Sequence, residues 1–141
     1  MLREKIISMI IALALDAGVP PYFALSIAMI ESELNPMAIN INQNGTYDRG
    51  IFQLNTSWHD DELWYEPERN IRAGIEHIKM LMAVPELLTL WSVAVSYNCG
   101  HIRFLSEQGP PVASIGYARK VMAKYEELSG RDCLIMVPGR K

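Results

Sequence analysis

The sequence of 141 residues predicts an α+β fold that is predominantly α-helical and carries one small β-hairpin. Several long segments place apolar residues three and four positions apart, which is the spacing of a helix with one buried face. Between them, the dipeptide Asn44-Gly45 separates two short stretches that favour strands, as in a tight hairpin turn. The length is near the commonest size of one domain, and no repeat or linker is evident. A single domain over residues 1–141 is therefore expected, with 130–141 as a C-terminal tail.

The first element is expected to be a helix within "MLREKIISMIIALALDAG". A secretory signal peptide also begins with a basic residue and an apolar run, and the small residues from Ala12 to Ala14 would suit its cleavage site. Helical spacing of the apolar residues, followed by Asp16 and Gly18 as stop signals, favours the helix. The apolar residues at this spacing are Ile6, Ile7, Ile10, Ile11 and Ala14. The route of export stays open.

Prolines set the bounds of the next elements. Pro20 and Pro21 suit the start of a second helix, "PYFALSIAMIES", and Pro36 helps to end it. Alternating Ile39 and Ile41 then predict a strand. The hairpin is therefore expected within "AININQNGTYDRGIF".

The second half of the chain is predicted to be helical with short breaks. A third helix should start near Pro67 and run through "NIRAGIEHIKMLMA" until Pro85 breaks it. The strongly apolar "ELLTLWSVAVSYN" predicts a fourth helix. A last helix, "ASIGYARKVMAKYEEL", follows the loop formed by Gly109, Pro110 and Pro111.

The composition excludes several classes of protein. A formal net charge of −3 is not that of a nucleic-acid binder. Two cysteines, Cys99 and Cys133, are too few for a disulfide framework or a zinc site. No apolar run reaches the roughly 20 residues of a membrane span. The acidic stretch from His59 to Glu62 lacks the spacing of a metal site, and no glycine-rich phosphate loop is present. No cofactor and no metal are expected.

Glu31 is the first candidate for catalysis. It closes the apolar second helix, where Ile27 and Ala28 share its face. A carboxyl group held against apolar side chains resists ionisation, so its pKa rises and it can donate a proton near neutral pH. A glutamate at a helix end that simply reaches solvent is the alternative, and on position alone it is the commoner case.

Three further features favour the catalytic interpretation of Glu31, although each of them also has a purely structural alternative. Gly50 to Gln53 form a Gly-x-x-Gln box, in which Gln53 can hydrogen-bond to the amide or hydroxyl groups of a sugar. Tyr97 and Asn98 end an apolar helix, where polar groups commonly face a cleft. Asp48 supplies a second carboxylate beside the hairpin turn. The aromatic residues Trp58, Trp64 and Tyr65 could stack on sugar rings or belong to the core.

The ordered boxes "IESELNP", "RGIFQLN", "NIRAGIEHI", "AVSYNCG" and "YARKV" resemble the lytic transglycosylases of the soluble-lytic-transglycosylase, goose-lysozyme-like type. The resemblance runs from about Ile11 to Tyr125 and implies a lysozyme-like fold. It implies that Glu31 is the catalytic acid and later the base. It also implies the residues that bind substrate, namely Ser32, Gln53 (to an N-acetyl sugar), Tyr97, Asn98 and Tyr117.

The hairpin segment resembles a different group, the animal-type (c-type) lysozymes. Counted from Glu31, the matching positions follow without a gap: Asn42, Gly45, Asp48, Gly50 and Gln53. Asp48 falls where those lysozymes carry their second carboxylate. The resemblance therefore leaves the outcome of the reaction open, whereas both groups imply the same substrate.

The expected function is cleavage of the β-1,4 bond between N-acetylmuramic acid and N-acetylglucosamine in peptidoglycan, giving 1,6-anhydro ends. One alternative is a hydrolytic lysozyme (muramidase) that uses Glu31 and Asp48. Another is a glycan-binding module without catalysis, in a phage or secretion apparatus. The expected partner is the peptidoglycan glycan strand, bound by a monomer at the cell wall or in the periplasm, without nucleic acid.

Overall fold

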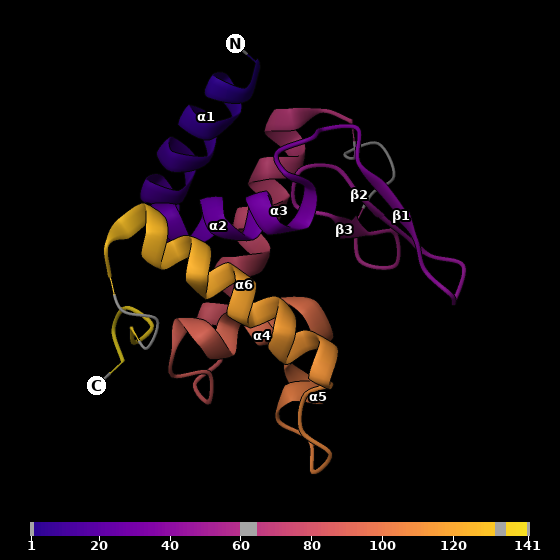
Figure 1. Cartoon of the computed structure of the whole chain (residues 1–141), viewed down its shortest axis with the longest axis vertical. Coiled ribbons are helices and arrows are strands. Elements are labelled where there is room, and N and C mark those ends of the chain that lie inside the picture. Colours follow the sequence, from indigo (N-terminus) through magenta and orange to yellow (C-terminus); the bar gives the residue numbers. More distant parts are fainter. Residues whose placement is uncertain (1, 60–64, 132–134, 141) are drawn as a thin grey trace. The chain divides into compact units, whose positions relative to one another are not determined.

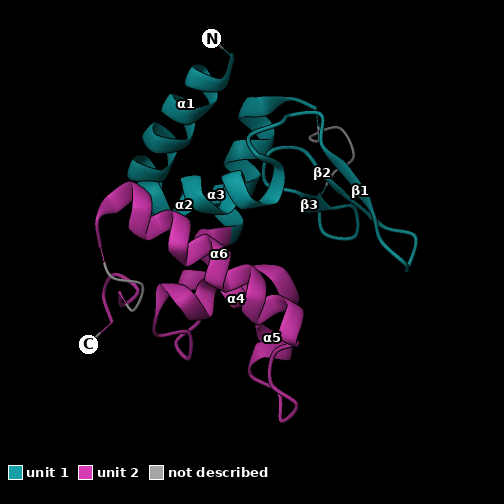
Figure 2. Ribbon diagram, viewed as in Figure 1, with its two compact units in different colours: residues 1–77 teal, residues 78–141 magenta. Residues whose placement is uncertain are grey.

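The computed structural model describes residues 2–59, 65–131 and 135–140, and it confirms a mostly helical α+β fold with a small antiparallel sheet (Figure 1). The chain forms two compact units, residues 1–77 and 78–141, which are described here in turn (Figure 2). The expectation of a single domain stays a prediction. The elements are α1 (Leu2–Ala17), α2 (Pro21–Ser32), β1 (Ile39–Ile41), β2 (Tyr47–Arg49), β3 (Leu54–Asn55), α3 (Pro67–Met82), α4 (Leu90–Cys99), α5 (His101–Phe104) and α6 (Val112–Ser129).

Helix α1 is confirmed, and it packs against α2 in the first unit. Ile6, Ile10 and Ala14, each one turn after the last, are fully buried. Burying an isoleucine side chain contributes about 1.5–3 kcal/mol, so this stripe anchors the helix. Within the described ranges, no helix combines the length and apolarity needed to cross a membrane.

Helix α2 forms the centre of the first unit and ends beside the candidate acid. Pro21 occupies its first position, and every residue from 23 to 28 is buried. The helix stops because Glu33 adopts a left-handed conformation with φ of 53°, and its N–H donates to the carbonyl oxygen of Met29. Leu34 follows, also with positive φ (65°), and its side chain is buried. Glu31 therefore lies in the last turn of a helix whose end is fixed by two unusual backbone conformations.

The predicted hairpin is present, and the chain adds a third strand that the sequence did not indicate. The strand order is β1-β2-β3, and both pairs are antiparallel. Asp48 in β2 is directly opposite Asn40 in β1 and Asn55 in β3. Because directly paired residues share one face, these three polar side chains form a ladder on one face of the sheet. Arg49 and Leu54, on the other face, are buried.

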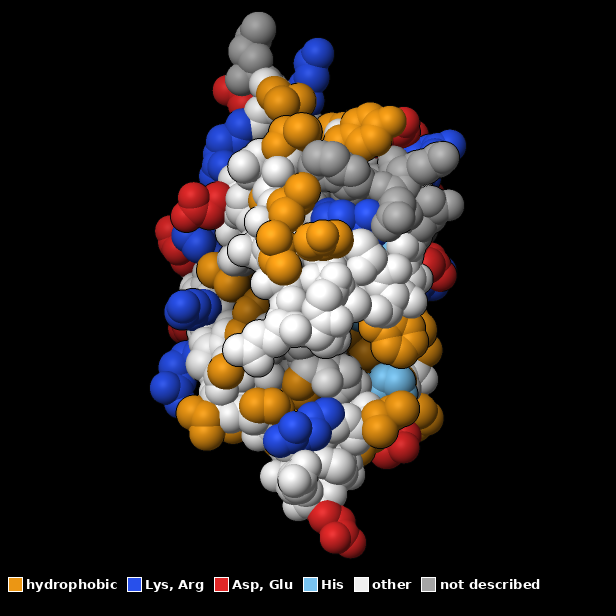
Figure 3. Space-filling view, turned by 90° about the vertical axis from the view of Figure 1, so that its right-hand side faces the viewer, with side chains coloured by type: hydrophobic (Ala, Val, Ile, Leu, Met, Phe, Trp, Pro, Cys, Tyr) orange, Lys and Arg blue, Asp and Glu red, His pale blue; other side chains and the backbone are white. Residues whose placement is uncertain are grey.

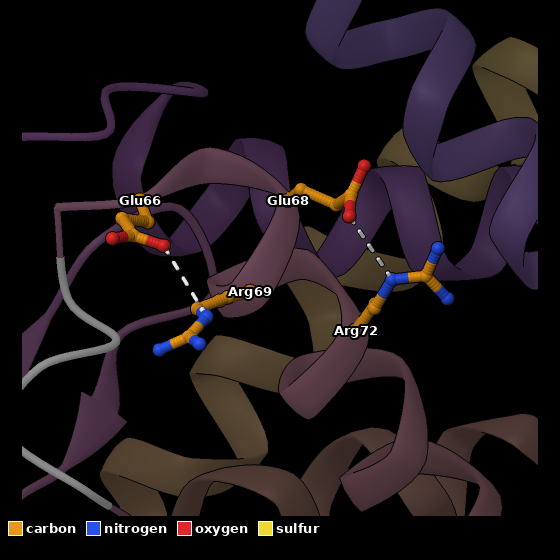
Figure 4. A network of polar contacts seen from close by, with 4 residues as sticks. All are labelled: Glu66, Glu68, Arg69 and Arg72. Carbon is orange, nitrogen blue, oxygen red and sulfur yellow. Dashed lines mark hydrogen bonds and ion pairs between the residues drawn. The ribbon is translucent and has the colours of Figure 1, made fainter.

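Helix α3 begins at Pro67 as predicted and packs closely on the turn after β2. Gly74 makes this approach possible, since a Cβ atom at that position would lie 2.2 Å from Cγ of Phe52. Two exposed ion pairs flank the start of the helix, Glu66–Arg69 at 3.3 Å and Glu68–Arg72 at 3.5 Å (Figure 4). Exposed pairs contribute at most about 1 kcal/mol each, so the packing of Phe52 matters more.

Helix α4 of the second unit begins at Leu90, so the expected start near residue 86 is wrong. Thr89 caps the helix: its side chain accepts a hydrogen bond from the N–H of Ser92, whose hydroxyl in turn accepts one from the N–H of Thr89. This capping box fixes the first turn and leaves residues 86–88 outside the helix. Helix α4 packs against α5 and α6, and Gly100, with φ of 85°, forms the junction to α5.

The C-terminal tail is docked on the second unit. Ile135 and Val137 form backbone hydrogen bonds with Leu90 and Leu88, each 2.9 Å long, and the side chain of Val137 is buried. Arg140 Nη2 donates to the carbonyl oxygens of residues 82 and 84, at 2.7 and 2.8 Å. A cation bound to carbonyl groups at the end of α3 also complements the helix dipole. The described part of the tail, 135–140, therefore belongs to the packed structure of this unit.

The surface carries charges of both signs. Figure 3 shows basic and acidic side chains dispersed among apolar and neutral ones on the face that it draws. Such a mixture agrees with the small net charge of the sequence, −3.

Replacing Gly74 by alanine tests the close packing of α3. We expect Gly74→Ala to lower the stability by about 1–3 kcal/mol, because the added methyl group overlaps the Phe52 ring. Thermal unfolding should show a fall in Tm of about 3–10 °C. The matched control is Gly116→Ala in α6, where nothing lies within 4 Å of the added Cβ atom. There the substitution should stabilise the protein by about 0.5–1 kcal/mol, and equal effects at both sites would contradict the packing argument.

Candidate active site

Glu31 is half-buried in the last turn of α2. Its same-face neighbours Ile27 and Ala28 are both fully buried, so the apolar face that the sequence indicated is present. A carboxyl group at the edge of such a face can serve as a proton donor. The raised pKa expected for Glu31 stays a prediction.

Ser32 connects the Glu-Ser box to the Gly-x-x-Gln box. Its hydroxyl donates to the carbonyl oxygen of Ile51 at 2.7 Å and lies 3.3 Å from the carbonyl oxygen of Ala28. A serine hydroxyl has one hydrogen to donate, and the shorter contact takes it. Ser32, expected from the resemblance to bind substrate, therefore has a structural bond that fixes the end of α2 against the hairpin.

Gln53 lies in the turn after β2 and is buried, with 8% of its surface exposed. Its Nε2 donates to the carbonyl oxygens of Ala38 and Gly50, at 3.1 and 3.0 Å, and its Oε1 accepts from Asn40 Nδ2 at 2.6 Å. Both amide hydrogens are thus bound within the protein. What the side chain can still offer a ligand is the second lone pair of its carbonyl oxygen. These bonds show that Gln53 supports the hairpin. That Gln53 also binds an N-acetyl sugar stays a prediction.

Asn70 is a supporting residue that the sequence analysis did not single out, although it opens the "NIRAGIEHI" box. Its side chain is 1% exposed and reaches from α3 to the turn. Its Oδ1 accepts from the N–H of Phe52 at 2.8 Å, and its Nδ2 donates to the carbonyl oxygen of Arg49 at 3.1 Å. Asn70 and Gly74 are four residues apart, hence on one helix face, and both contact Phe52. That spacing was the signal available in the sequence.

Asp48 is half-buried in the central strand β2. Asn55 Nδ2 donates to its Oδ1 at 2.9 Å and lies 3.0 Å from the hydroxyl of Thr46. These bonds give the carboxylate a fixed direction on the polar face of the sheet. The expected separation of Asp48 from Glu31 by the distance of paired glycosidase carboxyl groups stays a prediction.

Unusual backbone conformations gather in the same two boxes. In the part of the chain that the structure describes, the non-glycine residues with positive φ are Glu33, Leu34 and Gln53. Each such conformation costs on the order of 1–3 kcal/mol and persists only when its surroundings enforce it. Residues of this kind cluster at functional sites, so the backbone independently points to the region around Glu31.

The remaining candidates lie in the second unit. Tyr97 and Asn98 occupy the last turn of α4, and Tyr117 lies in α6. Asn98 is exposed, and its Oδ1 accepts from the hydroxyl of Ser114 at 2.7 Å, which orients the amide. Tyr97 and Tyr117 are half-buried. The expected convergence of these residues on Glu31 stays a prediction.

Among the aromatic candidates, Trp58 has 81% of its surface exposed and Tyr65 has 51%. Exposed rings are available for stacking on sugars. Trp64 and residues 60–62 of the acidic stretch lie outside the described residues, as does Cys133. Cys99, half-exposed, is a free thiol.

A family model, the transglycosylase SLT domain, matches residues 8–114. The chain belongs to this family. A search among curated proteins found no match. The SLT domain is a peptidoglycan lytic transglycosylase domain, so the chain is an enzyme of this class and its substrate is cell-wall peptidoglycan.

The matched region of this SLT enzyme contains the first four boxes. Glu31, Asp48 and Asn98 all lie within it, whereas Tyr117 and the docked tail lie beyond residue 114. The lysozyme-like α+β fold that the resemblance implied is confirmed by the match together with the helices and the small sheet.

In this transglycosylase His59 lies close to a buried arginine, since Nη2 of Arg49 is 3.5 Å from the carbonyl oxygen of His59. The backbone N–H of His59 donates to the carbonyl oxygen of Asn55 at 3.1 Å. The imidazole ring of His59 packs edge-on against that of His77, with 6.0 Å between the ring centroids. Burial, and then the positive charge of Arg49, lower the pKa of His59 below its ordinary value of 6.5. The folded protein therefore favours the neutral imidazole.

The stability of the protein should consequently fall as the pH drops through the range in which histidines titrate. The unfolded chain binds a proton at His59 near pH 6.5, while the folded chain binds it only at lower pH, so the stabilisation is complete above pH 6.5 and is lost below. Urea unfolding at pH 7.5 and 5.5, above the range of most carboxyl groups, measures the difference. His59→Gln should reduce this difference in stability between the two pH values. His101→Gln removes a histidine elsewhere, and an equal reduction by both variants would contradict the assignment to His59.

Proposed function

We propose that this enzyme cleaves the β-1,4 bond between N-acetylmuramic acid and N-acetylglucosamine with Glu31 as acid and then base, leaving 1,6-anhydro-muramic ends. The observation that carries the proposal is the bond of 2.7 Å from Ser32 to Ile51. It joins the helix end that bears Glu31 to the hairpin that bears Asp48 and Gln53. A proton donor must be held in a fixed place to act on a bound glycosidic oxygen, and this bond supplies such a constraint.

In the first step, Glu31 transfers its carboxyl proton to the glycosidic oxygen. The bond from the anomeric carbon to that oxygen breaks, and N-acetylglucosamine leaves with a free hydroxyl group. Positive charge develops on the muramic ring. The N-acetyl carbonyl oxygen of the substrate itself stabilises that charge on the anomeric carbon.

In the second step, the ionised Glu31 takes the proton from the 6-hydroxyl group of the muramic sugar. The oxygen of that group bonds to the anomeric carbon and closes the 1,6-anhydro ring. Glu31 is protonated again, and no water is consumed. One carboxyl group thus serves both steps, which agrees with its place at the boundary between an apolar face and solvent.

The other candidates are assigned to holding the glycan. Gln53 offers its carbonyl oxygen to an N-acetyl group, while Ser32 keeps the helix end in place. From the second unit, the residues proposed to hold the glycan are Asn98, exposed and oriented by Ser114, Tyr97 and Tyr117. Exposed Trp58 offers a stacking surface. The enzyme is proposed to act as a monomer at the cell wall or in the periplasm.

Hydrolysis is a second candidate outcome, because Asp48 has a fixed direction on the polar face of the sheet through its bond with Asn55. A second carboxylate can stabilise or trap the cation, after which water completes the reaction. Glu31 would then act on water instead of the 6-hydroxyl group. The two outcomes share the substrate and the acid, and they differ by one water in the product.

Glu31→Gln tests the acid. The amide keeps the shape of the side chain and removes the transferable proton, so the rate of peptidoglycan solubilisation should fall about 10²–10⁴-fold. Folding should change little, which circular dichroism and Tm can verify. Glu76→Gln, at an exposed position of α3, is the matched control. Clearance of purified cell walls by Glu31→Gln at the wild-type rate would refute the assignment.

Asp48→Asn separates the two outcomes when the released muropeptides are analysed by mass spectrometry. For the transglycosylase reaction we expect anhydro ends from the wild type, and a modestly reduced rate with the same product from Asp48→Asn. Asparagine keeps an oxygen that can accept the hydrogen bond of Asn55. If the wild type releases only reducing ends and Asp48→Asn is inactive, the enzyme is a hydrolase instead.

A further inference from the structure

Asn70 binds the backbone of the turn after β2 at two points. It accepts from the N–H of Phe52 and donates to the carbonyl oxygen of Arg49, with Gly50 and Ile51 between them. One side chain thus holds a carbonyl group and an N–H group that are three residues apart in the chain. With 1% of its surface exposed, Asn70 makes these bonds away from water, where a polar group that loses its partner is not compensated by solvent.

The same turn presents one carbonyl group to another element. Ile51 lies between the two residues that Asn70 binds, Arg49 and Phe52. Its carbonyl oxygen accepts the hydrogen bond from the hydroxyl of Ser32. Ser32 directly follows Glu31 in the chain. An unbroken path of hydrogen bonds and backbone therefore leads from α3, through the turn, to the end of the helix that carries the proposed acid.

We infer that Asn70 is a positioning residue for the reaction proposed above: acting through the turn at 49–52 and through Ser32, it holds Glu31 in place against the strand of Asp48. The inference rests on the proposed role of Glu31. Asn70 acts through other groups, since its amide is buried and bound to backbone at both ends.

The backbone after Glu31 explains why such support is needed. Glu33 and Leu34 both have positive φ, a conformation that relaxes when its surroundings no longer enforce it. If the bond of Ser32 to Ile51 loosens, the last turn of α2 is free to shift. A displacement of about 1 Å in a reacting group costs on the order of 10²-fold in rate.

The test compares kcat and KM on a defined muropeptide chain for Asn70→Ala, Ser32→Ala and the double variant, at a temperature where each is folded. Both single variants should lose about 10–100-fold in kcat, with KM changed by less than about threefold. The double variant should be no slower than the slower single variant, because both cut one path. A residue that only binds substrate would raise KM instead.

Two control variants separate positioning from general destabilisation. Glu76→Gln changes an exposed residue of α3, and Ser129→Ala removes a serine hydroxyl at the end of α6 that donates to the carbonyl oxygen of Tyr125. Both should keep the wild-type kcat. Folded Asn70→Ala with wild-type kcat, or effects of Asn70 and Ser32 that multiply in the double variant, would overturn the inference. If Asn70→Ala does not fold, Ser32→Ala decides alone, and an unchanged kcat overturns it.

A measurement without turnover distinguishes this inference from the proposed function. The titration of the Glu31 carboxyl carbon, followed by NMR, should move by about half a pH unit or more in Asn70→Ala and in Ser32→Ala, and stay in place in Glu76→Gln. If wild-type protein cleaves no glycan but these titrations move, the proposed function fails and the positioning stands. If the titrations coincide with wild type, the positioning is wrong whatever the activity.

Discussion

The hydrogen bond between the hydroxyl of Ser32 and the carbonyl oxygen of Ile51 joins the two halves of the candidate site in the first unit. On one side of it, α2 ends in two residues with positive φ, and on the other a tight turn leads to Gln53, which also has positive φ. Neither end is a conformation that the chain adopts cheaply alone. The Ser32–Ile51 bond links the two, so the end of α2 is held by the turn after β2 as well as by its own helix.

Side-chain amides supply hydrogen bonds that hold the short strands and turns of this small sheet together. Strands of three, three and two residues are too short to be stable alone in water. Asn70 binds the backbone of the turn, Gln53 binds the carbonyl groups of residues 38 and 50, and Asn55 links β3 to Asp48. These amide side chains therefore support the backbone of the hairpin, and the glycan-binding role proposed for Gln53 comes in addition.

Local signals in the sequence predicted most of the helices, because Pro21, Pro67 and the apolar spacing act within a few residues. They failed where a contact distant in the chain decides. The third strand exists only through its pairing with β2. The two hydrogen bonds of Asn70 reach Phe52 and Arg49, which lie 18 and 21 positions earlier in the chain. The start of α4 was misplaced for a local reason, since the capping box of Thr89 outweighs the apolar residues before it. For the candidate site, the sequence named Glu31 and Gln53, but their burial and bonding depend on this long-range packing.

Glu31 and Asp48 lie in different surroundings within the first unit, and this difference suits the different roles proposed for them. Glu31 lies in the last turn of a helix, and its same-face neighbours Ile27 and Ala28 are fully buried. Asp48 belongs to a ladder of asparagine side chains on a strand and accepts a hydrogen bond from Asn55. An apolar setting favours a carboxyl group that holds its proton, which is what the acid role proposed for Glu31 requires. The division of roles proposed above, acid and electrostatic partner, therefore rests on one carboxyl group at the end of an apolar helix and another on a polar strand.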